Sequence, residues 1–221
     1  MRIRFKPWAR PELEASYFYE DIPENYIGKW KERFKNPDKP LHIELGCGKG
    51  SFISELAFRN QDINYIAIDL VDAMLGLAKR KVEEKYNDNN LRVDNLILVR
   101  YDIERINNII NLEDGVQRIY INFCNPWPKP KHKKKRLTHT KQLEHYKEFI
   151  KNGAEIYFKS DDDGLFNDSL KYFEEAGFEI IKKTFDLHNE DIFDGKNIVT
   201  EHEKMFSDEG IKIKALIAKL K

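Results

Sequence analysis

The feature of this chain that most restricts its fold is the alternation of short apolar runs with longer amphipathic stretches. The apolar runs, bounded by polar residues or glycine, are predicted to be strands at residues 41–45, 64–70, 95–100, 118–123 and 155–159. The stretches between and after them are predicted to be helices at residues 51–59, 72–86, 103–110, 138–151 and 164–176. Strands separated by helices pair in parallel, and a parallel sheet is covered on both faces. The sequence therefore predicts a doubly wound, Rossmann-like α/β fold.

The pattern changes towards both ends of the chain. Residues 178–185 and 211–220 are strand-like, and no helix strong enough for a crossover is predicted between them. They are expected to form an antiparallel pair, which gives a mostly parallel sheet with an antiparallel C-terminal strand. Residues 1–40, with their prolines and exposed-looking aromatics, are expected to form an irregular arm packed on the domain of residues 41–221.

Net charge gives no indication of the partner, because the 38 Lys and Arg residues balance the 38 Asp and Glu residues. No apolar run approaches the roughly 20 residues that span a bilayer, and the basic N-terminus lacks the apolar segment of a signal peptide. A cytoplasmic protein without a membrane partner is expected. Cys47 and Cys124 lie far apart with no metal-ligand spacing, so free thiols and no metal site are predicted.

A glycine-rich loop, IELGCGKGSF, follows the first predicted strand. Gly46, Gly48 and Gly50 alternate in it, and Glu44 comes two residues before the first glycine. Glycine allows a sharp turn and close approach of the backbone to a ligand. The dinucleotide pattern is G-x-G-x-x-G, with a pyrophosphate at a helix N-terminus. Here E-x-G-x-G-x-G resembles the loop of class I S-adenosylmethionine-dependent methyltransferases, so this cofactor is expected rather than NAD.

Two carboxylates follow the next two predicted strands. Asp69 ends the second strand, where an acidic side chain can accept both hydroxyls of a ribose, and Asp102 follows the third strand, close to the expected adenine. With Glu44 and the glycines they are candidates for cofactor binding, because ligands of doubly wound sheets bind at the carboxyl ends of the strands. The alternative is a tight turn at residues 46–50 with Asp69 and Asp102 as helix caps.

The loop after the fourth predicted strand reads Cys124-Asn-Pro-Trp-Pro-Lys129 and is followed by a basic run. One interpretation is the (Asp/Asn/Ser)-Pro-Pro-(aromatic) turn of amino-group methyltransferases, which act on adenine N6 or glutamine N5. Asn125-Pro126-Trp127 is one residue short of that pattern. In the other interpretation, the basic run binds RNA phosphates.

The chain resembles the bacterial tRNA (guanine-N7-)-methyltransferase family, and it does so in segments spread over nearly its whole length. The loop typically reads Asp-Pro-Trp-Pro-Lys there, followed by a basic stretch that contains His and ends in Arg-Leu. The other matching segments are Phe5-Lys-Pro-Trp-Ala9, His42-Ile-Glu-Leu-Gly-Cys-Gly-Lys-Gly50, Phe158-Lys-Ser-Asp161, Asp186-Leu-His188 and Thr200-Glu-His-Glu203.

The resemblance implies a class I methyltransferase that methylates N7 of guanine in tRNA, in the variable loop, with S-adenosylmethionine as methyl donor. It assigns substrate binding to Lys129, Asp161, Thr200, Glu201, His202 and Glu203. It assigns RNA binding to Lys131, His132, Lys133, Lys134, Lys135 and Arg136. Without the resemblance, a helix N-cap at Asp161, an acidic surface turn at residues 200–203 and a solvated charge run are the alternatives.

Asn125 departs from the family, which usually has Asp at this position. Asn125 is a candidate both for cofactor binding and for stabilising the positive charge that methylation creates on guanine, and reduced activity is expected relative to an Asp variant. A tRNA-binding protein with weakened catalysis is therefore a further alternative. Trp127 is expected to pack into the core rather than to stack on a base. The sequence leaves a monomer and a homodimer open.

Overall fold

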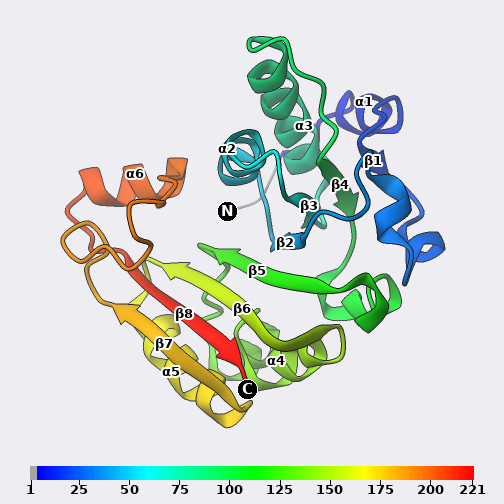
Figure 1. Ribbon diagram of the computed structural model, residues 1–221. Helices are drawn as coiled ribbons and strands as arrows, with labels where there is room; N and C mark the ends of the chain where they lie inside the picture. Colours follow the sequence, from blue (N-terminus) through cyan, green and yellow to red (C-terminus); the bar gives the residue numbers. More distant parts are fainter. Residues whose placement is uncertain (1–3) are drawn as a thin grey trace.

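Eight strands form a single sheet in the order β1-β4-β3-β2-β5-β6-β8-β7 in the computed structural model, which describes residues 4–221 (Figure 1). The strands are β1 (Tyr19–Glu20), β2 (Leu41–Leu45), β3 (Asn64–Asp69), β4 (Leu96–Arg100), β5 (Val116–Asn122), β6 (Ile150–Ser160), β7 (Phe178–Thr184) and β8 (Lys214–Leu220). All neighbours from β1 to β6 pair in parallel, whereas β8 is antiparallel to both β6 and β7. The predicted fold class is confirmed.

Helices cover both faces of this sheet (Figure 1). The α-helices are α1 (Ala9–Glu14), α2 (Ser51–Arg59), α3 (Asp72–Asn87), α4 (Thr140–Lys147), α5 (Asp163–Glu175) and α6 (Glu201–Asp208). The 3₁₀ segments are η1 (Pro23–Tyr26), η2 (Trp30–Arg33), η3 (Ile103–Asn108), η4 (Leu112–Asp114) and η5 (Pro130–Lys135). Helices α1, α2 and α3 lie on one face, and α4 and α5 lie on the other (Figure 1). No helix in residues 4–221 is long and apolar enough to cross a membrane.

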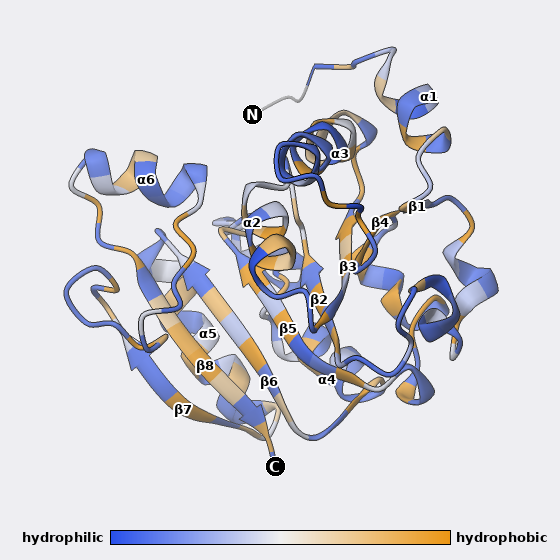
Figure 2. Ribbon diagram, turned by 45° about the horizontal axis from the view of Figure 1, so that its top comes forward, coloured by the Kyte–Doolittle hydropathy of each residue, from blue (hydrophilic) through white to orange (hydrophobic). Residues whose placement is uncertain are grey.

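The central strand β2 is buried at every residue, as expected for a parallel strand packed on both sides. Apolar colour follows the central strands in Figure 2, whereas α3 presents hydrophilic residues on its outer side. The core therefore lies in two layers, one on each face of the sheet, and the polar residues that end the parallel strands are left at one edge.

Two predicted helices differ from the observed structure, and one observed helix was not predicted. Residues 103–110 form mainly the 3₁₀ segment Ile103–Asn108, and Arg105 inside it has non-helical backbone angles. The helix predicted over 138–151 ends at Lys147, because β6 already begins at Ile150. Between β7 and β8 the helix α6 was not expected; its eight residues are mostly polar and bury only Glu203, so they give little apolar periodicity.

The N-terminal arm is more regular than the irregular segment expected from the sequence; residues 1–3 lie outside the described part. Its strand β1 pairs with β4 and extends the sheet. Trp30 is fully buried, and its Nε1–H donates to the Ile109 carbonyl over 2.6 Å. The buried Asp114 carboxylate accepts the backbone N–H groups of Gly28 (3.0 Å) and Trp30 (3.1 Å). These contacts join the arm to residues more than 75 positions away, which local sequence patterns do not reveal.

Replacing Asp114 by alanine is expected to lower the free energy of unfolding by about 3 kcal/mol. Three backbone N–H groups, those of Gly28, Trp30 and Asn111, would lose their acceptor, and buried unpaired donors are costly. Urea unfolding measures the loss. Glu113→Ala, at the exposed neighbouring position, is the matched control and should change stability by less than about 0.5 kcal/mol. Equal effects of the two variants would contradict the anchoring role of Asp114.

Candidate active site

The carboxyl ends of the parallel strands bring the predicted site residues to one edge of the sheet. The glycine loop follows β2, Asp69 ends β3, Asp102 follows β4, Asn125 follows β5, and Asp161 follows β6. Figure 1 shows α6 beside the same ends of β5 and β6, facing α2. The sheet therefore collects residues that are more than 150 positions apart in the chain into one candidate site.

The glycine loop has a backbone that requires glycine. Gly46, Gly48 and Gly50 have φ angles of 79°, 54° and 75°, in the left-handed region. A Cβ atom on Gly50 would also stand 2.6 Å from the Cβ of Ala78 on α3, so any larger residue would push α2 and α3 apart. The Gly48 N–H donates to Asp69 Oδ2 over 2.9 Å, which ties the loop to the end of β3.

Asp69 and Asp102 both accept backbone hydrogen bonds. The second carboxylate oxygen of Asp69 accepts the N–H of Val71 over 2.9 Å, and burial raises the pKa of this carboxyl group. Each carboxylate oxygen has two lone pairs, so hydroxyl donors can still bind there. Asp102 caps η3 by accepting the Glu104 N–H over 3.0 Å, so the helix-cap alternative accounts for its local contacts. Both remain candidates for cofactor binding.

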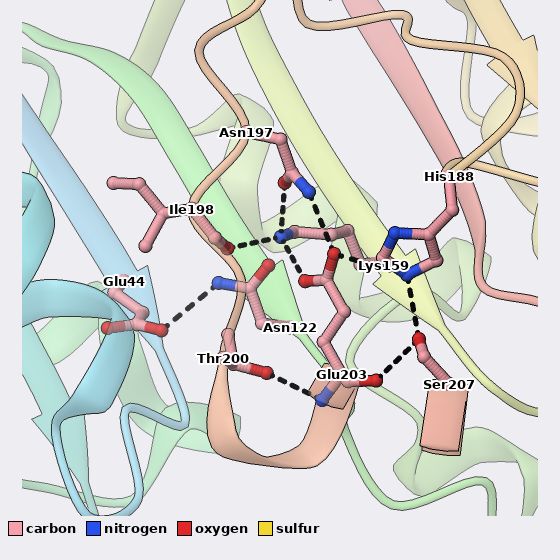
Figure 3. Close-up of polar contacts among 9 residues, drawn as sticks. All are labelled: Glu44, Asn122, Lys159, His188, Asn197, Ile198, Thr200, Glu203 and Ser207. Carbon is pink, nitrogen blue, oxygen red and sulfur yellow. Dashed lines mark hydrogen bonds and ion pairs between the residues drawn. The ribbon is translucent and has the colours of Figure 1, made fainter. Parts of the chain in front are cut away.

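Glu44 has a buried carboxylate with one oxygen unused. The Nδ2–H of Asn122 donates to Oε1 over 3.1 Å, whereas Oε2 has no partner within residues 4–221 (Figure 3). Burial raises the pKa of Glu44 to about 8, so at neutral pH the group is mostly protonated. A buried orphan oxygen beside the glycine loop fits a ligand group that is cationic or donates an N–H.

The turn after β5 is held in a strained conformation. Phe123 and Trp127 have φ angles of 51° and 41°, which non-glycine residues rarely adopt. The Asn125 Oδ1 accepts the backbone N–H of Trp127 over 3.0 Å and closes an Asx-type turn. From outside the turn, the Arg136 Nε–H donates to the Pro126 carbonyl over 2.7 Å. Strain held by specific contacts is a frequent property of functional sites.

Arg136 and Lys133 have positions that differ from the exposed RNA contacts predicted for the basic run. The Arg136 side chain is only 4% exposed and pairs with Asp168 on α5 over 2.6 Å. Lys133 pairs with the same carboxylate over 2.7 Å. The buried guanidinium thus supports the turn, and in this conformation its contacts are with Asp168 and Pro126. The residues of the run that remain exposed are Lys129, Lys131, Lys134 and Lys135.

Trp127 lies at the surface of the turn and not in the core, so the packing predicted for it is wrong. Its ring makes an edge contact with His132, at 5.5 Å between centroids, and the Lys135 ammonium lies 5.4 Å from its centre. The indole is therefore half-buried among the basic side chains that follow it. The two prolines beside it prevent the turn from joining a strand or helix.

The first turn of α6 places three of the predicted substrate residues above the strand ends. Thr200 Oγ1 caps the helix by accepting the Glu203 N–H over 3.0 Å. Glu201 forms ion pairs with Lys81 on α3 and, at 3.9 Å, with Lys49 of the glycine loop. The His202 ring is stacked on Phe123 of the strained turn, with 6.3 Å between centroids. This helix start therefore touches both the glycine loop and the turn after β5.

Asp161 does not cap the following helix, because its neighbour Asp162 does so through the Leu165 N–H at 2.6 Å. The Asp161 carboxyl is half-buried, and burial raises its pKa. A carboxylate at the strand end that is not used as a cap is available to a ligand. Glu203, in contrast, is fully buried and points inward, where it pairs with Lys159 at 2.8 Å.

Asn122 and Lys159 are polar contact residues that the sequence did not identify. They are register partners on β5 and β6 and lie at or near the ends of otherwise apolar strands. That polar ending is the signal that could have identified them. Cys47 and Cys124 are free thiols, as predicted, and burial raises the pKa of Cys124 to about 12. A neutral buried thiol is a poor nucleophile.

The doubly wound sheet, its left-handed glycine loop and the carboxylate at the end of the next strand are those of the class I methyltransferase fold. The 16S rRNA methyltransferase KamB is similar in structure, with a TM-score of 0.58 and 12% identity over 99% of this chain and 95% of its own, which shows a shared fold. Residues 38–216 match the model of a family described as "Putative methyltransferase".

Relatives similar over their whole length narrow this class. A tRNA (guanine-N(7)-)-methyltransferase of Clostridium beijerinckii is 61% identical over 99% of this chain and 98% of its own. One of Ruminiclostridium cellulolyticum is 58% identical over 100% of this chain and 93% of its own. The chain belongs to the tRNA (guanine-N(7)-)-methyltransferase family, as its sequence motifs predicted.

Proposed function

We propose that this protein transfers a methyl group from S-adenosylmethionine to N7 of a guanine in tRNA, in the variable loop, and that it works in the cytoplasm. The observation that carries the proposal is the 61% identity over 99% of the chain to a relative of that name. The site supports it, because the candidate cofactor residues, the Asn-Pro-Trp-Pro turn and the start of α6 lie at one edge of the sheet.

The residues at this edge fit the cofactor. The orphan oxygen of Glu44 is suited to an ammonium group, the Asp69 carboxylate is suited to ribose hydroxyls, and the glycine loop leaves room for close approach. Asp102 and Asn125 would complete the binding site. When bound, the cofactor supplies a methyl group on a positively charged sulfur.

Guanine N7 needs no general base, because it carries an unshared electron pair and no proton at neutral pH. When bound, the cofactor would supply the methyl group to N7 and would keep the electron pair of its S–CH₃ bond, so the protein would not have to accept a proton. The protein therefore contributes orientation and exclusion of water, effects worth several kcal/mol of barrier. The positive charge moves from sulfur to the purine, so acceptor oxygens near N7 favour the transition state.

Asn125 is less suited to stabilise this charge than Asp would be. Its Oδ1 already accepts the Trp127 N–H, and the other terminal atom of an amide is a donor nitrogen. An Asp could close the same turn with one oxygen and keep the second, negatively charged oxygen free. The backbone of the turn is thus compatible with either residue, while the electrostatics favour Asp.

Guanine and RNA would be bound by groups around this turn. The N1–H and N2–H₂ edge of guanine needs acceptors. Of the three carboxylates assigned to the substrate, Glu203 is buried in an ion pair, whereas Asp161 is half-buried and Glu201 is exposed. Thr200 and His202 hold the start of α6 in place, and Lys129 lies exposed in the turn itself. Lys131, Lys134 and Lys135 are exposed and available to phosphates, with His132 beside Trp127.

Methyl transfer from labelled cofactor to unmodified total tRNA, followed by identification of the nucleoside, tests the function. We expect 7-methylguanosine, located in the variable loop by cleavage at the modified base. N6-methyladenosine would instead support the amino-group alternative. Binding of cofactor and tRNA without any transfer would support the weakened tRNA-binding protein.

Cofactor affinity is expected to rise with pH between about 6 and about 7.5, by up to tenfold per unit. The raised pKa of Glu44 means that a cation must displace a proton from this group on binding. Calorimetry in two buffers of different ionisation enthalpy would reveal the released proton. Glu44→Gln should bind more weakly and lose this dependence; an equally steep dependence in that variant would assign the proton to another group.

Asn125→Asp is expected to raise kcat/KM for tRNA about tenfold, which corresponds to about 1.4 kcal/mol of transition-state stabilisation. Steady-state kinetics of the parent and the variant measure the ratio, and equal melting temperatures would show that the turn is intact. An unchanged kcat/KM would mean that no carboxylate acts at this position. A parent without turnover beside an active variant would mean that the carboxylate is indispensable.

Replacing Lys131, Lys134 and Lys135 together by alanine should weaken tRNA binding and reduce the slope of log Kd against log salt by about 2 to 3. Cofactor affinity should stay within about twofold, because these side chains are exposed and solvent screens their charges from the strand ends. The charge-matched control replaces Lys151, Lys219 and Lys221, exposed residues around the opposite ends of β6 and β8. Equal losses in both triple variants would contradict a specific RNA surface at residues 129–135.

A further inference from the structure

The Lys159 ammonium is buried at the carboxyl end of β6 and bound entirely by one distant segment. It donates to Asn197 Oδ1 (2.8 Å), to the Ile198 carbonyl (2.9 Å) and to Glu203 Oε2 (2.8 Å), as Figure 3 shows. An ammonium has three donors, and all three are used. Every partner comes from residues 197–203, the stretch that leads into α6 and forms its first turn.

Both carboxylate oxygens of Glu203 also have hydrogen-bond partners. It is 0% exposed, and its second oxygen, Oε1, accepts the Asn197 Nδ2–H over 2.7 Å. The His188 Nε2 lies 3.8 Å from the same oxygen. The backbone N–H of Glu203 donates to Thr200 Oγ1, and the Glu203 carbonyl accepts the hydroxyl of Ser207 (Figure 3). Glu203 therefore faces the sheet, and a guanine could not reach its carboxylate without breaking this cluster.

Burying the Lys159–Glu203 ion pair costs free energy. Two charges lose their hydration on burial, and apolar residues of similar volume are often as stable or more stable. What the pair supplies is a single arrangement, because three fixed donors must meet three fixed acceptors. The aromatic rings of Phe52 and Phe193, with centroids 5.4 Å and 5.8 Å from the ammonium, limit where else it could go.

This cluster is connected both to the start of α6 and to the candidate cofactor residue Glu44. With Glu203 held inward, the same helical turn presents Glu201 to Lys81 and His202 to Phe123. On the other side, Lys159 is the register partner of Asn122, which donates to Glu44, and the Lys159 charge acts on Glu44 as well. Lys159 thus stands between the candidate cofactor carboxylate and the start of α6.

We propose that Lys159 is a positioning residue for methyl transfer, which holds residues 197–203 against β6 and so sets the start of α6 over the glycine loop and the turn after β5. This inference rests on the proposed function. Lys159 touches neither the methyl group nor the guanine in this role; it acts through Glu203 and Asn197. Its loss should therefore impair tRNA turnover far more than cofactor binding.

The test compares Lys159→Met, Lys159→Arg and the charge-free pair Lys159→Met/Glu203→Met in full-length protein. The double variant removes both charges, so no unpaired buried charge remains to unfold the chain. We expect it to bind S-adenosylmethionine within about threefold of the parent, while kcat for unmodified tRNA falls about 100-fold, the size of effect produced by misplacing groups by about 1 Å. Lys159→Arg keeps the positive charge and N–H donors, although in a larger planar group, and should retain more activity than Lys159→Met.

Asn95→Ala is the control for loss of a buried polar cluster elsewhere. The Asn95 side chain donates to the carbonyls of Ala57 and Ile63 at the opposite edge of the sheet, so this variant should lose stability and keep its kcat. A double variant with parental kcat would overturn the inference, as would equal losses in Lys159→Arg and Lys159→Met. A parent that makes no 7-methylguanosine would overturn the proposed function first, and the two failures are thereby distinguished.

Discussion

The site depends above all on the parallel pairing of β3, β2, β5 and β6. Parallel pairing brings the carboxyl ends of these strands to the same edge, and each strand there ends in a loop that carries polar groups. The antiparallel strand β8 then fits between β6 and β7, and the chain between β7 and β8 forms α6 over that edge. One pairing rule thus collects the glycine loop, the strained turn and α6 in one place.

Most of the polar residues at this edge hold the backbone of the site. Asp69 binds the glycine loop, Arg136 supports the turn at Pro126, and Lys159 binds the segment that leads into α6. This use of charged groups suits methylation at an atom that needs no deprotonation, because such a reaction is accelerated mainly by orientation and a dry environment. It is also compatible with Asn125, whose Oδ1 closes the turn after β5 as an Asp oxygen would.

Local patterns in the sequence were sufficient for the sheet, the glycine loop, and the residues that follow the strands, because each depends on a few neighbouring residues. They were insufficient where a side chain acts over a long distance. Arg136 lies in a basic run and was expected to face RNA, but Asp168 and Pro126 draw it into the interior. Glu203 was expected to contact the substrate, but it pairs with Lys159, which is 44 residues away in the sequence. A periodic pattern of neighbouring residues does not reveal such a pair. The regular structure of the arm and the helix α6 were not predicted for the same reason. Both are stabilised by contacts with distant residues and not by an apolar periodicity of their own.

The central claim is that this site orients guanine N7 and does not activate it. The most direct measurement is the single-turnover rate of methyl transfer to tRNA against pH, at saturating cofactor. With no proton to remove, the rate is predicted to stay flat from about pH 6.5 to about pH 8.5. A rate that rises about tenfold per pH unit through this range would show that a group of the protein must act as a general base, and would contradict the account.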